Sequence, residues 1–177
     1  MLFFVLLLVA SGVMGQTEEP TKEQLGFDIN YKDHMTYFKT YCMSKNIDYE
    51  VIDIREFSGE DDGIIYKVIE LKNGVKYLYR LNPSETFSLM VIACKNEYLA
   101  EDALINLMSF TESLGDKYDE KNSYRKIANI VSEVNRGINE YQVKWDDTYL
   151  YKTYDETQNS PDYFYYWFPE YLGVSVQ

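Results

Sequence analysis

The chain has 177 residues, a formal net charge of −12 at pH 7, two cysteines and one histidine. The excess of acidic side chains disfavours binding to nucleic acids and to anionic membrane surfaces, because both carry phosphate groups that repel a negative protein. A single histidine excludes a metal site built from several histidines and leaves few routes to histidine-based catalysis.

The first fifteen residues carry no charge and are typical of a secretory signal peptide. Leu2–Val9 form an apolar run, and small residues follow it. The run is shorter than the ~20 residues needed to cross a bilayer. We therefore expect a cleaved signal at 1–15, a flexible mature N-terminus at 16–22 and a single domain at 23–177. The mature protein is expected to be secreted into the extracellular space, without membrane association.

The rest of the chain has the element order of an α+β domain. Apolar residues at helical spacing, Met35, Phe38 and Cys42, predict an N-terminal helix that ends near Asn46. A four-stranded antiparallel sheet follows, with strands expected at 48–57, 64–71, 75–81 and 86–94. Two helices come next, the first capped by Asn96 and ended by Gly115, the second capped by Ser123 and ended near Gly137. C-terminal strands complete the domain, including a hairpin around 146–148 and an aromatic segment.

Asn73-Gly74, between the second and third strands, is a strong hairpin signal, because both residues readily adopt positive φ. A two-residue loop sets a register in which Val68 opposes Tyr79. One face of the sheet is then more apolar than the other, as expected for a sheet that is covered on one side.

Cys42 lies near the end of the first helix, and Cys94 ends the fourth strand. An even cysteine count in an oxidising compartment favours a disulfide. We expect a Cys42–Cys94 bridge that joins the helix to the sheet and contributes about 4 kcal/mol. The alternative is a pair of buried free thiols.

Candidate catalytic and metal-binding residues are few. His34 lies beside Asp33 on a helix without a nucleophile elbow, which predicts a surface histidine with no role. Glu60, Asp61 and Asp62 lie between two glycines, but the loop is too short to supply the ligands of a calcium site. We interpret them as an acidic hairpin tip that can contact a basic partner. No cofactor, metal site or catalytic residue is predicted.

The chain is rich in aromatic residues, with 18 Tyr, 9 Phe and 2 Trp, and they are densest in "DYFYYWFPEY", Asp162 to Tyr171. Three interpretations are open. The stretch is a core strand with apolar side chains on both faces, or an exposed patch in which Tyr165, Trp167 and Tyr171 anchor a partner, or a disordered acidic-aromatic tag. For the third, "FPEYLG" resembles the tail of hirudin-type thrombin inhibitors. Strand propensity favours the first.

A helix followed by four antiparallel strands is similar to the element order of cystatins. The Gln-Val-Gly hairpin motif of that family is absent, the corresponding turn here being "FSGEDDG", and two later helices are foreign to it. The resemblance is therefore one of element order, which does not by itself imply inhibition.

Together these features predict a secreted, acidic, non-catalytic binding protein. Its partner is expected to be an extracellular protein or a small ligand, contacted through Glu60–Asp62 and the aromatic tail. One alternative is an extracellular hydrolase that uses paired carboxylates, for which no pair stands out among 29 Asp and Glu. The other is a structural or storage protein.

Overall fold

The computed structural model describes residues 30–58, 64–82, 84–113, 120–136, 142–145, 148–155 and 162–169. The expected signal peptide at 1–15, the flexible segment at 16–22, the acidic tip Glu60–Asp62 and Tyr171 lie outside these ranges.

The described residues form a mixed α+β structure, as the sequence predicts. Its helices are α3 (Tyr31–Ser44), α4 (Glu97–Ser113) and α5 (Glu120–Arg136). Its strands are β1 (Val51–Ser58), β2 (Ile65–Leu71), β3 (Lys76–Leu81), β4 (Phe87–Cys94), β5 (Gln142–Trp145), β6 (Thr148–Asp155) and β7 (Asp162–Pro169). The predicted hairpin of the C-terminal region is confirmed as β5–β6.

The prediction of a four-stranded sheet is incomplete, because β1–β4 form one part of a larger antiparallel sheet. The strand order is β1-β2-β3-β4-β7-β6-β5. The aromatic strand β7 lies between β4 and β6, with Val91 opposite Tyr166 on one side and Tyr151 opposite Tyr166 on the other. Residues Phe164–Phe168 are buried, and their side chains alternate between cores on the two sides of the sheet. The core-strand interpretation of Tyr163–Phe168 is therefore confirmed.

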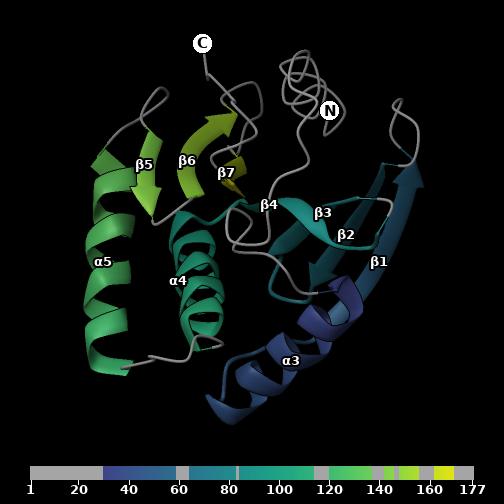
Figure 1. Cartoon of the computed structure of the whole chain (residues 1–177), viewed down its shortest axis with the longest axis horizontal. Helices are drawn as coiled ribbons and strands as arrows, with labels where there is room; N and C mark the ends of the chain where they lie inside the picture. The colour runs from purple at the N-terminus through teal and green to yellow at the C-terminus, as the bar shows by residue number, and fades with distance from the viewer. Residues whose placement is uncertain are drawn as a thin grey trace.

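All three described helices pack on one side of the sheet, which we call the helix face. Figure 1 shows α4 and α5 lying side by side, with α3 beside the half of the sheet that holds β1–β3. The Phe38 ring of α3 lies 5.7 Å from the Tyr77 ring of β3. Leu107 of α4 and Val131 of α5 are buried in the same core as Ile92 of β4. Apolar burial against the sheet, rather than intrinsic propensity, holds the helices in place.

The helix starts follow from local hydrogen bonds. The Asn96 side chain accepts a hydrogen bond from the Leu99 backbone N–H at 3.2 Å, which confirms the predicted cap of α4. The predicted cap of α5 at Ser123 is wrong, because the helix begins at Glu120. Ser123 lies within the helix, where its hydroxyl donates to Glu112 Oε2 of α4 at 3.3 Å.

The predicted register of the β2–β3 hairpin is wrong by one residue. Val68 opposes Leu78, and the Leu71 backbone N–H donates to the Val75 carbonyl at 2.8 Å. The loop therefore holds three residues and ends at Gly74, whose φ of +90° belongs to the region that glycine tolerates best. A shift of one residue moves each tyrosine of β3 to the opposite face. Tyr77 and Tyr79 thus join the helix face.

The predicted Cys42–Cys94 disulfide is also corrected, because both cysteines are free and buried. Cys42 lies on the inner stripe of α3, and both side chains belong to the core of the helix face. The Cys94 sulfur accepts a hydrogen bond from the Asn96 backbone N–H at 3.4 Å. Both cysteines therefore act as small apolar core residues, which is a common role for a buried thiol.

Candidate functional site

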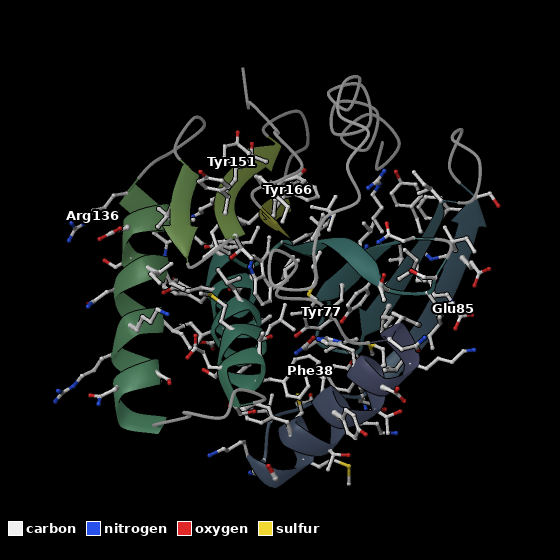
Figure 2. The ribbon with its side chains drawn as sticks, viewed as in Figure 1. Phe38, Tyr77, Glu85, Arg136, Tyr151 and Tyr166 are labelled. Carbon is white, nitrogen blue, oxygen red and sulfur yellow. The ribbon has the colours of Figure 1, made fainter. Side chains whose placement is uncertain are left out.

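The side of the sheet away from the helices, which we call the second face, carries its own apolar layer. Figure 2 shows Tyr151 and Tyr166 on this side, whereas Phe38 and Tyr77 lie between the sheet and α3. The layer contains residues of β2, β3, β4 and β7, and no helix of the described ranges contributes to it. Its buried members are Tyr66, Val68, Leu78, Leu89, Val91, Ala93, Phe164, Tyr166 and Phe168.

Strand register arranges the second face in rows that run across the strands. One row, which we call the first row, crosses four adjacent strands near the Asn73-Gly74 turn: Glu70, Lys76, Ala93 and Phe164. The next row, which we call the second row, begins with a charged residue at the edge strand and is apolar over its centre: Arg55, Val68, Leu78, Val91, Tyr166 and Tyr151. The face therefore changes from charged at the turn end to apolar over its centre.

A pocket of about 210 Å³ opens at the first row. Ala93 and Phe164 are the apolar residues of its lining, and Lys76 and Lys95 are the basic ones. The Asn73-Gly74 turn and Asn96 complete the lining from the two ends. The pocket is smaller than the ~300–1,000 Å³ of sites for drug-sized ligands. It suits a small molecule or one end of a larger one.

The charges around this pocket are unevenly paired. The Glu70 carboxylate lies 3.0 Å from the Arg55 guanidinium and 3.8 Å from Lys76 Nζ, and Arg55 also pairs with Asp53 at 2.8 Å. Lys95 is exposed and forms no ion pair with any residue that the structure describes. The pocket therefore has an excess of positive charge within a protein of net charge −12, which favours an anionic group there.

Tyr166 carries a buried polar atom on the second face, outside the lining of the pocket. Its ring lies 6.4 Å from the ring of Phe164, and its hydroxyl is buried without a hydrogen-bond partner in the described chain. Burial raises the pKa of Tyr166 well above its usual value, and the nearby Tyr151 adds to the shift. The hydroxyl consequently stays protonated at pH 7.

The sequence-predicted anchors Tyr165 and Trp167 do not reach the surface. They are 1 % and 2 % exposed and belong to the core of the helix face. The Tyr165 hydroxyl donates to Asn135 Oδ1, and Trp167 Nε1–H donates to Thr148 Oγ1, both at 2.8 Å. These two rings therefore act in folding, and the expectation that they form an exposed patch is not met. The other predicted contact residues, Glu60–Asp62 and Tyr171, are outside the described ranges.

The prediction that His34 lies at the surface is wrong, because its exposed fraction is only 2 %. Its imidazole lies among the rings of Phe110, Tyr79 and Phe38, at centroid distances of 5.2, 5.7 and 6.0 Å. Burial lowers the pKa of His34 to about 3, so the ring is neutral at pH 7. A neutral ring enclosed by aromatic side chains packs as part of the core.

A buried polar group around Lys152 was missed by sequence reasoning. Lys152 Nζ of β6 donates to Glu97 Oε1 at the start of α4 at 2.5 Å and to Asn135 Oδ1 near the end of α5 at 3.0 Å. Its ammonium also lies 5.4 Å from the centre of the Tyr165 ring. The alternation of "TYLYKTYD" places Lys152 on the same face as Leu150, which was the available signal. The arrangement holds both helices to the sheet, and the described pocket does not reach it.

The pocket residues were missed for a different reason, which is the wrong hairpin register. Once Glu70 is placed opposite Lys76, the charged end of the second face can be read from the sequence. Their proximity to Ala93 and Phe164 depends on pairings between distant strands. No local signal predicts those pairings.

Among the described residues, no group of three or more His, Cys, Asp and Glu side chains is placed to hold a metal ion. None of the helices within those ranges has the length and apolar character to cross a bilayer. No family model, no curated protein and no solved structure matches the chain.

Proposed function

We propose that the protein is a non-catalytic binding protein that takes a small organic anion into the pocket at the first row. The observation that carries the proposal is that two apolar residues, Ala93 and Phe164, and two basic residues, Lys76 and Lys95, line one cavity. Such a mixture of apolar walls and a few convergent polar groups is the usual composition of a small-molecule site.

The lining gives each part of such a ligand a partner. An apolar or aromatic body packs on Phe164, and an acidic group lies near the lysines. A charge-assisted hydrogen bond contributes about 1.5–3 kcal/mol, so the loss of one lysine weakens binding by roughly 10-fold or more. A carboxylate fits better than a cation, because the lining holds two lysines and one carboxylate, Glu70.

A hydrolytic function is less well supported by the same pocket. Glu70 is the one carboxylate among the described residues that line it, whereas hydrolysis by paired carboxylates needs two acidic groups about 5–10 Å apart.

The proposal also places the mature protein outside the cell, because the uncharged N-terminal segment is typical of a secretory signal peptide. Sequencing the N-terminus of the protein released by expressing cells tests that part, and a chain retained with Met1 contradicts it.

The binding function is tested by titrating the purified protein with small carboxylates, matched amines and matched neutral amides, using isothermal titration calorimetry. We expect carboxylates to bind and the other two classes not to. Lys95→Ala and Lys76→Ala should each weaken binding about 10-fold. Lys39→Ala, which removes an exposed lysine of α3 outside the pocket, is the matched control and should change nothing. Carboxylate binding that survives both pocket substitutions would refute the site.

A further inference from the structure

We propose that the outer edge of β1 is a dimer interface, at which a second copy of this chain pairs its own β1 antiparallel to the first. The inference is independent of the pocket and of any ligand. It rests on two observations. β1 exposes apolar side chains along an edge that no described strand occupies, and its charges complement one another in a two-fold arrangement.

β1 is the outermost strand at one end of the sheet, and no residue of the described ranges pairs with its outer edge. Figure 1 shows it at that edge, away from α4 and α5. Its side chains are exposed over nearly the whole strand, including those of Ile52 and Ile54 at 58 % and 62 %. A long edge strand with exposed apolar side chains is a template for pairing with another chain.

The hydrogen-bonding pattern indicates which backbone groups of β1 point to this edge. The Leu71 N–H donates to Val75, which precedes β3, and residues of an antiparallel strand bond alternately to its two neighbours. Residues 70, 68 and 66 of β2 therefore bond to residues 53, 55 and 57 of β1, which lie opposite them. The backbone N–H and C=O groups of Ile54 and Glu56 consequently point outward. A two-fold antiparallel pair joined through these groups places even-numbered residues opposite one another.

The charges of β1 favour one such register. When Ile54 lies opposite the partner's Ile54, Asp53 lies opposite the partner's Arg55 and Arg55 opposite the partner's Asp53, which forms two opposite-charge pairs. Centring the pair on residue 53, 55 or 56 instead places two aspartates, two arginines or two glutamates directly opposite each other. Like charges in that position destabilise a strand pair. The side chains of Arg55 and Asp53 are 56 % and 47 % exposed, so both are accessible to a partner.

The same register brings the exposed isoleucines together. Ile54 lies opposite Ile69 of β2, which belongs to the core of the helix face, so Ile54 projects to that side. Side chains alternate along a strand, and Ile52 therefore shares the side of Ile54. In the pair centred on Ile54, each Ile54 lies opposite its copy and diagonal to the partner's Ile52, which is within reach of a long side chain. Four isoleucines that water surrounds in the single chain become partly shielded.

The interface is short, because the pairing of β1 is irregular between Val51 and Asp53. The regular stretch, 52–56, is symmetric about Ile54. A contact of this size suits a reversible dimer rather than an obligate one. The net charge of −12 opposes association, so the measurement belongs at about 0.15 M salt, where a Debye length of about 8 Å screens the long-range repulsion.

The test is sedimentation equilibrium of the purified protein and of two charge reversals, Asp53→Arg and Arg55→Asp. We expect the wild type to show a reversible monomer–dimer equilibrium. Each variant alone should weaken dimerisation about 10-fold or more, because it replaces two opposite-charge pairs by two like-charge pairs. An equimolar mixture of the two variants should dimerise as the wild type does, since each arginine of one chain then faces an aspartate of the other. Lys39→Glu, on the exposed side of α3, is the matched control, because it changes the net charge as Arg55→Asp does and should leave the equilibrium unchanged.

Cross-linking tests the register. Residues that form a hydrogen-bonded antiparallel pair have Cα atoms ~5.5 Å apart, a distance that a disulfide spans. Ile54→Cys should therefore give a disulfide-linked dimer when the protein is oxidised with diamide. Glu56→Cys, two positions from the two-fold axis, should give none. The native Cys42 and Cys94 are buried and should not compete.

The outcomes are decisive in either direction. A wild-type protein that stays monomeric at millimolar concentration refutes the interface, and so does dimerisation that survives both charge reversals. A mixture of the two variants that stays monomeric also refutes it. Recovery in the mixture requires both variants to be folded, so misfolding cannot be mistaken for support.

Discussion

Acidification from pH 7 to pH 5 should destabilise this protein through one residue. His34 is the only histidine in the chain, and histidine is the side chain whose ordinary pKa of about 6.5 falls in this window. Burial lowers the pKa of His34 in the folded protein to about 3. In this range the unfolded chain therefore binds a proton that the folded chain does not.

The size of the effect follows from linkage. A base with a lowered folded pKa contributes stability that is present above its unfolded pKa and is lost as the pH falls towards its folded pKa. Each pH unit below about 6.5 costs about 1.4 kcal/mol, so pH 5 lies about 2 kcal/mol below the plateau at pH 7. For a chain of this size, that corresponds to a fall of about 4–8 °C in the midpoint of thermal unfolding. The ordinary pKa values of aspartate and glutamate, about 3.9 and 4.3, lie below this window.

The assay is urea unfolding of the wild-type protein and of His34→Phe and His34→Leu at pH 7 and pH 5. Both replacements are apolar, which suits a site formed by Phe38, Tyr79 and Phe110, and neither has a titratable group. We expect the wild type to lose about 2 kcal/mol and each variant to lose less than about 0.5 kcal/mol. Equal losses in the wild type and in both variants would refute the assignment of the effect to His34.

Three further predictions concern stability. Lys152→Met should lower the free energy of unfolding by about 2 kcal/mol. Loss of one partner of a buried pair costs ~3–5 kcal/mol, and the cost is smaller here because the side chain of Glu97 is 39 % exposed and stays partly solvated. Chemical denaturation checks this, and a second change, Glu97→Gln, should recover part of the loss. Gly74→Ala should cost about 1 kcal/mol through its φ of +90° alone, since an added Cβ meets no atom within 4 Å; no measurable loss would contradict that strain. The unfolded, non-reduced chain should titrate with two thiols, whereas in the folded chain Cys42 should react slowly, because burial raises its pKa to about 12; a chain without free thiols would show that the disulfide exists.

Local patterns were sufficient for most of the elements. Phe38 and Cys42 mark the inner side of α3, and Leu107 and Phe110 mark that of α4, as their helical spacing predicts. The side-chain oxygen of Asn96 caps α4, as predicted. These features depend on residues within one or two turns of each other, which a single sequence displays directly.

Register and strand order could not be predicted in the same way. Asn73-Gly74 is compatible with a two-residue or a three-residue loop, and the choice depends on which tyrosines of β3 pack under α3. The position of β7 between β4 and β6 pairs Met90 with Trp167, residues far apart in the sequence. Such contacts are selected by the burial of the whole sheet, which no short stretch records.

The candidate site shows the same division. The charges of Glu70, Lys76 and Lys95 are visible in the sequence, but their meeting with Phe164 requires four strands to be placed side by side. The sequence predicted His34 at the surface and gave no prediction for Lys152, because neither residue lies in an apolar run. Tertiary packing buries both side chains. The sequence by itself determined the α+β class, the acidic charge and the two-sided apolar character of the aromatic strand. The tertiary structure alone decided which side chains share a face, because that depends on long-range pairing and on what covers each side of the sheet.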